Sequence, residues 1–332
     1  MIDRMNRRDF MRASGFAGLG AALAGWGLSP AGLAHAAEAN PDEKYIMVSN
    51  VSAHPYWLDA QYGGQDAAAQ LGVTWVYTGP ADFDTPSQVT ALEQLIPTKP
   101  AGMIVAALQP DAIGASIDKA IDAGIPVVTV DTDAPASKRL TYLGTANYQA
   151  GRDMASAMLA ALNGEAGKIG LATVPGQFNL EERIRGIKDV LTEKGGAEIV
   201  MTVDDKADDA ATADAVVAML QSHPEINLVS SINAVGAGVA AALRQTNNVG
   251  KVKAVTFDIT EPIIAGLEDG TIESTMVQRT YMMTYVGMLL LYAQHHPSEY
   301  LQNWLDNGLT VLPYAVDTGV MTIKKDMTAP FK

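Results

Sequence analysis

The sequence predicts an α/β protein built from two doubly wound parallel-sheet lobes. Short β-branched apolar runs alternate with longer amphipathic runs, and the apolar runs are too continuous for strands with one solvated face. Such strands are typical of parallel sheets with helices on both faces. The alternation runs through one series and then restarts, and 332 residues with 48% hydrophobic side chains suffice for two cores.

The first series predicts four strands and three helices. The expected strands are 45–48, 73–77, 102–106 and 126–130, and the expected helices are 56–71, 87–96 and 111–123. Gly72 supplies the C-terminal stop of the first helix, and Pro86 precedes the second helix as a start signal. The second series starts after a polar break at 144–151 and repeats the same order. Its expected strands are 168–172, 197–203, 227–231 and 252–257, and its expected helices are 180–194, 210–221 and 237–244.

Residues 1–36 are predicted to be a twin-arginine-type signal peptide. Arg7 and Arg8 lie in a short polar run, a Gly- and Ala-rich apolar stretch follows, and 34–36 read Ala-His-Ala, the pattern of a cleavage site. No cysteine follows the apolar stretch, which excludes lipid anchoring there. We therefore expect the mature chain in the periplasm.

Composition excludes several classes of function. The formal net charge of −14 repels phosphate backbones and anionic lipid, so neither nucleic acid nor a membrane surface is an expected partner. The chain contains no cysteine, which rules out disulfides, thiolate catalysis and cysteine-based metal sites. No segment after the signal reaches the roughly 20 apolar residues of a membrane span, so the mature chain is not expected to insert in a bilayer.

Polar and aromatic side chains follow the predicted strands. Ligands of open parallel sheets bind beyond the C-terminal strand ends, so these residues are candidates for a site. They combine aromatic faces with carboxylate, amide and guanidinium groups, the mixture that sugar rings and polyols require. The candidate ligand-binding residues are His54, Tyr56, Trp57, Asp131, Thr132, Arg183, Asn233, Asp258 and Gln278.

Seven short pieces, taken together in this order, resemble a known family. They are 54–57, 125–131, 144–151, 182–186, 231–233, 255–258 and 316–320. Over about residues 44–325 the chain resembles the ribose-binding-like periplasmic sugar-binding proteins of ABC transporters, which are type I periplasmic binding proteins.

The resemblance implies a three-strand hinge, with chain crossings near 145, 278 and 310. It implies an N-terminal lobe of 43–145 plus 279–310 and a C-terminal lobe of 146–278 plus 311–332. It further implies a monomer without enzymatic activity or cofactor, which captures a monosaccharide or sugar alcohol by lobe closure and delivers it to an ABC transporter permease.

The resemblance also implies where the candidate residues lie. His54, Tyr56 and Trp57 would form the wall of the first lobe with Asp131. The second lobe would contribute Arg183, Asn233 and Asp258, with Gln278 near the hinge.

Two positions depart from the family pattern. Ribose-type members often have arginine after the aspartate at 131, whereas this chain has Thr132 and then Asp133, so one guanidinium is lost and one carboxylate gained. At the second-lobe aromatic position the chain has Ala207, which leaves stacking on one side of the ligand. These departures argue against ribose and favour a smaller or more flexible polyol.

Structural roles compete with ligand contact at several positions. Tyr56 and Trp57 are also candidates for the core, Asp131 for a structural turn, and Asp258 and Asn233 for helix caps. His54 has no partner in the sequence. Arg185 rivals Arg183 as the guanidinium of the site.

Two other motifs are interpreted as non-functional. His295 and His296 are not predicted to bind metal, because adjacent residues on a helix or strand point apart and no third ligand is near in sequence. The acidic run 204–209 lacks the pattern of an EF-hand and is predicted to be a solvated loop.

Other functions remain open from the residues alone. The ligand of a binding protein could be a furanone signal, a nucleoside or an amino acid. Asp131 and Asp258 could act as the paired carboxylates of an exported sugar-processing enzyme. A repressor core shares the architecture, but the export signal occupies the place of its DNA-binding segment.

Overall fold

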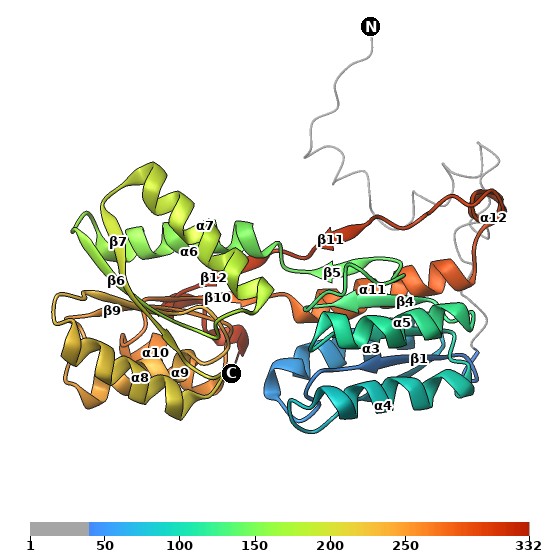
Figure 1. Ribbon diagram of the computed structural model, residues 1–332, viewed down its shortest axis with the longest axis horizontal. Helices are drawn as coiled ribbons and strands as arrows, with labels where there is room; N and C mark the ends of the chain where they lie inside the picture. Colours follow the sequence, from blue (N-terminus) through green and yellow to red (C-terminus); the bar gives the residue numbers. More distant parts are fainter. Residues whose placement is uncertain (1–39, 332) are drawn as a thin grey trace, which may run out of the picture.

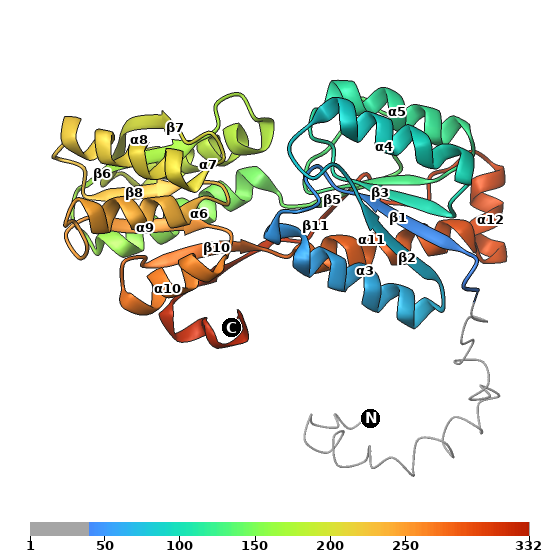
Figure 2. The same cartoon turned by 90° about the horizontal axis from the view of Figure 1, so that it is seen from below.

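Residues 40–331 are described by a computed structural model, in which two lobes lie side by side (Figures 1 and 2). Each lobe is built on one six-stranded sheet. The prediction of two doubly wound parallel-sheet lobes is confirmed. The predicted signal peptide at 1–36 lies outside the described residues.

The N-terminal lobe contains an entirely parallel sheet with strand order β11-β5-β4-β3-β1-β2. Its strands are β1 Lys44–Val48, β2 Thr74–Thr78, β3 Gly102–Val105, β4 Val127–Val130, β5 Tyr142–Gly144 and β11 Ala315–Asp317. Its helices are α3 Leu58–Leu71, α4 Thr85–Leu95, α5 Pro110–Asp122, α11 Thr280–His295 and α12 Glu299–Asp306, with 3-10 turns η2 Pro55–Trp57 and η3 Ile96–Thr98.

The C-terminal lobe repeats this plan with strand order β12-β10-β9-β8-β6-β7, in which β12 alone runs antiparallel. Its strands are β6 Gly167–Thr173, β7 Ala197–Asp204, β8 Leu228–Ser231, β9 Lys253–Phe257, β10 Ser274–Gln278 and β12 Val320–Ile323. Its helices are α6 Asn147–Leu162, α7 Phe178–Lys194, α8 Asp209–Ser222, α9 Gly236–Gln245 and α10 Glu261–Asp269, with 3-10 turns η4 Lys325–Met327 and η5 Ala329–Phe331.

Hydrophobic cores lie on both faces of each sheet. In the N-terminal lobe, α3 and α11 pack on one face, where Leu291 is fully buried. The helices α4 and α5 pack on the other face, where Ile117 is fully buried. In the C-terminal lobe, α6 and α7 cover one face, where Ile187 is fully buried. The helices α8 to α10 cover the other face, where Val239 is fully buried. Because both faces are covered, the strands between them are continuously apolar, as the sequence pattern indicates.

Three connections join the two sheets. The chain passes from β5 to α6 through Thr145 and Ala146, from β10 to α11 through Arg279, and from β11 to β12 through Thr318 and Gly319. They therefore form the hinge region.

Hydrogen bonds tie the hinge connections to one another. The backbone N–H of Thr318 donates to the carbonyl of Gly144 at 2.8 Å, and the Arg279 guanidinium donates to the carbonyl of Thr318 at 3.0 Å. Gly319 has φ of 69°, and a Cβ there would lie 3.1 Å from the Arg279 guanidinium. Glycine is therefore the residue that this crossing accommodates best.

The third crossing lies later than the predicted position near 310. Residues 315–317 pair with β5, so they belong to the N-terminal lobe and not to the C-terminal lobe as predicted. The Arg139 side chain explains the difference, since it donates to the carbonyl of Tyr314 at 2.9 Å and lies 4.4 Å above the Tyr314 ring. These contacts hold the segment against the N-terminal lobe until Asp317.

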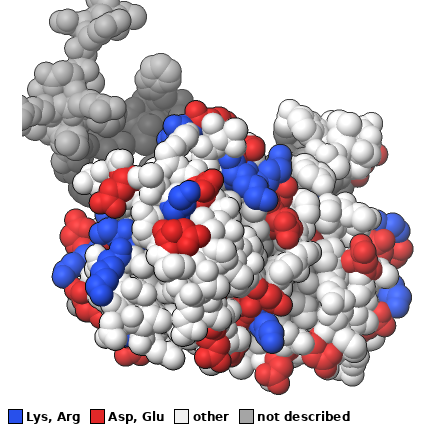
Figure 3. Space-filling model, turned by 60° about the vertical axis from the view of Figure 1, so that its left-hand side comes forward, with Lys and Arg blue, Asp and Glu red and all other residues white. Residues whose placement is uncertain are grey.

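The surface in Figure 3 carries acidic and basic side chains interspersed, without a continuous basic patch on that face. Within residues 40–331, no helix is both long enough and apolar enough to cross a bilayer.

Candidate functional site

Two aspartates occupy equivalent places in the two lobes. Asp131 directly follows β4, and Asp258 directly follows β9, the strand at the same position of the second sheet. Both have a left-handed backbone, with φ of 61° and 62°. The sharp turn at each strand end presents a carboxylate at the C-terminal edge of its sheet, where open α/β sheets bind ligands.

Asp131 receives its carboxylate hydrogen bond from Tyr56. The Tyr56 hydroxyl donates to Oδ1, and it is the only hydrogen-bond donor to this carboxylate among residues 40–331. Burial raises the pKa of Asp131, and the Tyr56 hydrogen bond and the Arg183 charge oppose that rise. The carboxylate thus retains free acceptor positions.

Asp258 lies among the polar groups of the C-terminal lobe. It is 6% exposed, and Gln278 Nε2 donates to its Oδ1 at 3.0 Å. Burial raises the pKa of Asp258 to about 6, although the Arg183 charge and the Gln278 hydrogen bond act in the opposite direction. The negative charge of Asp131 from the other lobe raises this pKa further, because like charges disfavour ionisation.

Arg183 connects these groups. It is 2% exposed and donates to Asn147 Oδ1 at 2.8 Å, to the carbonyl of Ile232 at 2.8 Å and to Gln278 Oε1 at 3.2 Å. Its guanidinium carbon lies 3.8 Å above the centre of the Phe257 ring. Because a guanidinium carries five N–H donors, two remain for a ligand.

The alternative between the two arginines is decided by geometry. Arg185 is exposed and pairs with Glu182 on the same helix at 2.5 Å. Arg183, and not Arg185, therefore lies with the predicted site residues. We call Tyr56, Asp131, Arg183, Asp258 and Gln278 the interlobe site.

Tyr56 and Trp57 lie in different environments, although they are adjacent in sequence. Trp57 is 1% exposed in the core, where its Nε1 donates to Asn50 Oδ1 at 3.2 Å. Its ring meets the Tyr56 ring edge to face, with 4.9 Å between centroids. Trp57 thus supports Tyr56 from the core, whereas Tyr56 contacts Asp131.

The remaining predicted residues lie near this site or at its border. His54 caps the η2 turn, because its Nδ1 accepts the N–H of Tyr56 at 3.1 Å, and burial lowers the pKa of His54 while Asp209 of the other lobe raises it. Thr132 has a buried hydroxyl without a hydrogen-bond partner among the described residues. Asn233 accepts from Ser231 and donates to Asp205 Oδ1 at 3.0 Å.

The acidic run 204–209 differs from the predicted solvated loop. Asp205 is fully buried and accepts from Asn233 and from the backbone N–H of Ala207, while its Oδ2 has no partner among residues 40–331. Burial raises the pKa of Asp205. Asp205 directly follows β7. It therefore meets the criterion that selected Asp131 and Asp258, a polar residue directly after the C-terminal end of a parallel strand.

Asp133 does not contribute the extra carboxylate that the sequence indicates. Its two oxygens accept from Arg139 at 2.6 and 2.7 Å, and Oδ1 also accepts from Thr129. The Arg139 side chain is 2% exposed, so Asp133 is the counter-ion of a buried cation. The departure from the ribose-type pattern is therefore structural at this position.

The sequence analysis did not select two residues that contact the interlobe site. Asn147 accepts from Arg183, and Thr145 donates to Gln278 Oε1 at 2.8 Å. Both lie in the polar break at 144–151, for which the sequence predicts only a crossing between the lobes.

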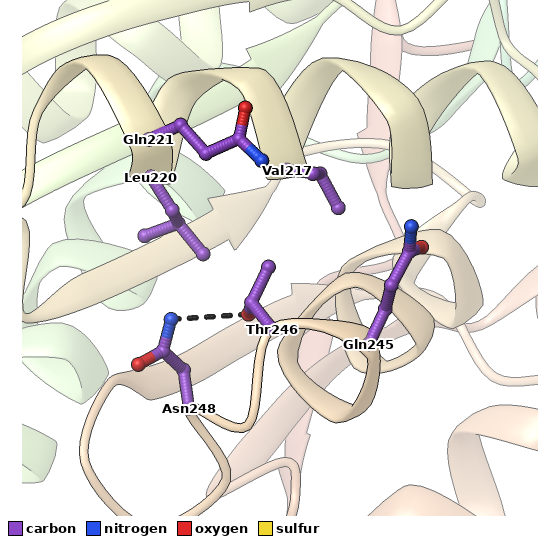
Figure 4. A pocket seen from close by; sticks show the side chains of 6 residues that line it. All are labelled: Val217, Leu220, Gln221, Gln245, Thr246 and Asn248. Atoms are coloured by element: carbon purple, nitrogen blue, oxygen red, sulfur yellow. Dashed lines mark hydrogen bonds between the residues drawn. The ribbon is translucent and has the colours of Figure 1, made fainter.

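A separate shallow pocket lies on the outer part of the C-terminal lobe. It has a volume of about 350 Å³ and is lined by residues near the C-terminal ends of α8 and α9 (Figure 4). It contains no charged group, and Asn248 donates to Thr246 at 3.0 Å within it. The lining residues are Val217, Leu220, Gln221, Gln245, Thr246 and Asn248.

Comparisons with known proteins agree with this architecture. A family model described as a periplasmic binding protein domain matches residues 45–295. The xylose/arabinose-binding protein XylF of Sulfolobus acidocaldarius is 26% identical over 309 residues, which are 88% of this chain and 73% of that protein. The ribose import binding protein RbsB of Bacillus subtilis is 26% identical over 236 residues, covering 70% of this chain and 75% of that protein.

Solved structures extend the similarity to three dimensions. The arabinose-binding protein AraP of Geobacillus stearothermophilus is 35% identical with a TM-score of 0.80, over 88% of this chain and 100% of that one. A solute-binding protein of Burkholderia graminis in complex with D-arabinose is 31% identical with a TM-score of 0.77, over 87% and 97% of the two chains. Fold, sequence and match length lead to one conclusion: this chain belongs to the periplasmic binding protein family.

Proposed function

We propose that this protein is the substrate-binding component of an ABC importer and that it captures a monosaccharide, most readily an aldopentose such as arabinose. One observation carries the proposal: the partly buried Asp131 of one lobe and the buried Asp258 of the other lie on either side of a buried arginine that has unused donors. Asp131 and Asp258 accept hydrogen bonds from hydroxyls, and Arg183 donates to hydroxyl or ring oxygens. This donor and acceptor set suits a neutral polyhydroxylated ligand.

The names of similar proteins support the choice of sugar. Xylose, arabinose and ribose appear in the names of similar sequences, and arabinose appears in those of two structures more than 30% identical to this chain. The Tyr56 ring, backed by Trp57, offers an apolar face for the C–H groups of a sugar. His54, Thr132 and Asn233 complete the proposed set of contacts.

Binding would proceed by closure of the lobes about the three connections. A ligand that contacts Asp131 and Asp258 together stabilises the closed state, because only that state offers both sets of contacts. Two or three charge-assisted hydrogen bonds of about 1.5–3 kcal/mol each, with aromatic packing, are compatible with micromolar or tighter binding after ordering costs.

The proposal includes the cellular setting. The predicted export signal at 1–36 would deliver the chain to the periplasm by the twin-arginine route, and the protein would act there as a monomer that presents its closed form to a permease. It would bind its sugar without converting it, and it would need no cofactor.

Titration calorimetry on the mature chain tests the proposal. We expect one site per chain and a dissociation constant at or below the micromolar range for D- or L-arabinose, with xylose, ribose, allose and the matching pentitols as competitors. Serine and adenosine are the controls for the amino-acid and nucleoside alternatives. Binding of a control in place of every sugar, or release of a modified sugar on prolonged incubation, would contradict the proposal.

A further inference from the structure

A second cluster of side chains, whose types can bind a metal ion, lies at the outer end of the N-terminal lobe. Glu43 directly precedes β1, His295 is the last residue of α11, and His296 is the residue that caps this helix. The helix starts beside the hinge and has 16 residues, which correspond to a length of about 24 Å. The cluster is therefore remote from the interlobe site, at the side of the lobe that faces away from its neighbour (Figure 2).

The three side chains converge on one point. Each offers one ligand atom, and these atoms lie within 4.8 Å of one another. His296 Nε2 lies 2.9 and 2.8 Å from the two carboxylate oxygens of Glu43. Metal–ligand distances of about 2.0–2.2 Å in tetrahedral zinc sites place ligand atoms about 3.3 Å apart, so small rotations of exposed histidine rings suffice to bind an ion.

The end of the helix explains how adjacent histidines meet. His296 has left the helical conformation, with φ of −119° and ψ of 60°. The His295 and His296 rings consequently lie edge to face, with 4.9 Å between their centroids. Adjacent residues point apart within a helix, but His295 and His296 lie on either side of its end. The third ligand, Glu43, is distant in sequence and comes from the segment that precedes β1.

The surroundings hold Glu43 in place. Its side chain is 4% exposed, and its Oε1 accepts a hydrogen bond from the fully buried Tyr45 hydroxyl. Tyr292 packs against His296, with 4.3 Å between ring centroids. Such outer contacts orient ligands in known metal sites.

An ion pair between Glu43 and His296 accounts for their contact but not for His295. The His295 ring makes no hydrogen bond within residues 40–331, although it lies next to a buried carboxylate. Two imidazoles and one carboxylate form a donor set that suits zinc and neighbouring transition metals, whereas magnesium and calcium prefer oxygen ligands.

We propose that Glu43, His295 and His296 bind one divalent transition metal ion, with zinc as the preferred ion and water at the remaining position. The ion would join the beginning of β1 to the end of α11 across 253 positions of sequence. A metal that binds only the folded chain stabilises it. The site would act as a staple in a protein that has no cysteine for a disulfide.

Zinc titration of the tag-free mature chain, cleared with chelator, tests this proposal. We expect one zinc ion per chain, and a melting temperature about 5 °C higher at a hundredfold excess of zinc over the dissociation constant. Magnesium should cause no shift. The His295→Ala variant leaves the Glu43–His296 pair intact and should bind zinc at least tenfold more weakly, with an unchanged melting temperature in chelator.

His223→Ala is the matched control, because His223 is also partly exposed and also pairs with a glutamate. It should bind zinc like the unaltered chain. A zinc affinity that is unchanged in His295→Ala, or that is lost in His223→Ala or His54→Ala, would overturn the proposal. Sugar titration in chelator is an independent readout, so failure here leaves the proposed transport function untouched.

Discussion

The two lobes use the same backbone turn to present an acid. Asp131 and Asp258 both have a left-handed backbone, and both backbone N–H groups donate to the next strand, to Leu143 at 3.1 Å and to Met276 at 2.6 Å. A non-glycine residue in this conformation costs on the order of 1–3 kcal/mol. Its presence at equivalent places in both lobes indicates that each sheet tolerates local strain in order to aim a carboxylate.

The lobes differ in how they balance the charge of that acid. In the N-terminal lobe the nearby cation, Arg139, pairs with Asp133, so Asp131 has a tyrosine hydroxyl as its partner. In the C-terminal lobe Asp258 lies beside Arg183, the cation that also lowers the pKa of Asp131. The N-terminal lobe therefore contributes Asp131 without a cation of its own, and the C-terminal lobe contributes Arg183. The two halves of the site are thus complementary in charge.

The largest expected effect comes from removal of that shared cation. Arg183→Met removes three buried hydrogen bonds of the guanidinium and the charge that favours ionised Asp258. Because hydrogen bonds to charged groups contribute about 1.5–3 kcal/mol each, it should lower the free energy of unfolding by about 3–5 kcal/mol. It should also abolish measurable sugar binding. Urea denaturation at neutral pH and calorimetry check both effects.

Arg185→Met is the matched control two residues away. Arg185 is exposed, and its contacts are a surface ion pair with Glu182 and the face of the Tyr148 ring, so its loss should change the free energy of unfolding by about 1 kcal/mol or less. Equal effects of the two substitutions would mean that Arg183 does not balance the acids of the site.

The next largest effect separates two aspartates of the N-terminal lobe. Asp131→Asn should weaken sugar binding by about 10- to 150-fold, which corresponds to the loss of one charge-assisted hydrogen bond, with little change in stability. Asp133→Asn should do the reverse, lowering the free energy of unfolding by about 1.5–3 kcal/mol because Arg139 loses its buried partner. Affinity should then change less than threefold. Calorimetry and urea denaturation of both variants would refute the division of roles if Asp133→Asn abolished binding at full stability.

Much of this architecture could be predicted from local sequence. The strand and helix periods and the residues after each strand suffice to select Asp131, Asp258 and Gln278, because a strand end fixes which sheet edge a side chain occupies. Trp57 could not be separated from Tyr56 in this way, since the η2 turn sends one ring into the core and leaves the other at the site.

Local sequence patterns do not predict contacts between residues that are not neighbours in the chain. The pairing of Asp133 with Arg139 depends on how the loop folds back. The meeting of Glu43 with His296 joins segments 253 positions apart. The position of β11 depends on the Arg139 contacts with Tyr314, which no periodicity in 311–317 indicates.

A smaller effect is expected from pH and would sharpen the contrast between the two acids. The pKa of Asp258 is raised to about 6 by burial, whereas hydroxyl donors of a bound sugar favour the ionised carboxylate and lower that pKa. Binding therefore releases a proton below pH 6, so affinity should fall about tenfold from pH 7 to pH 5 and stay level above pH 7. Calorimetry in two buffers of different ionisation enthalpy measures the proton release. Asp258→Asn should remove the pH dependence, and its persistence in that variant would assign it to another group.

The smallest expected effect concerns the carbonyls of the two strained turns. The Tyr142 hydroxyl donates to the carbonyl of Asp131 at 2.8 Å, and the Thr275 hydroxyl donates to that of Asp258 at 2.6 Å. Tyr142→Phe and Thr275→Val each remove one such bond, so each should lower the free energy of unfolding by about 1 kcal/mol and weaken sugar binding two- to threefold. If only one variant lost stability in urea, the two turns would share a backbone conformation, but only one of them would depend on its hydroxyl hydrogen bond. Equal losses would instead show that a hydroxyl from the neighbouring strand holds each aspartate in its left-handed conformation.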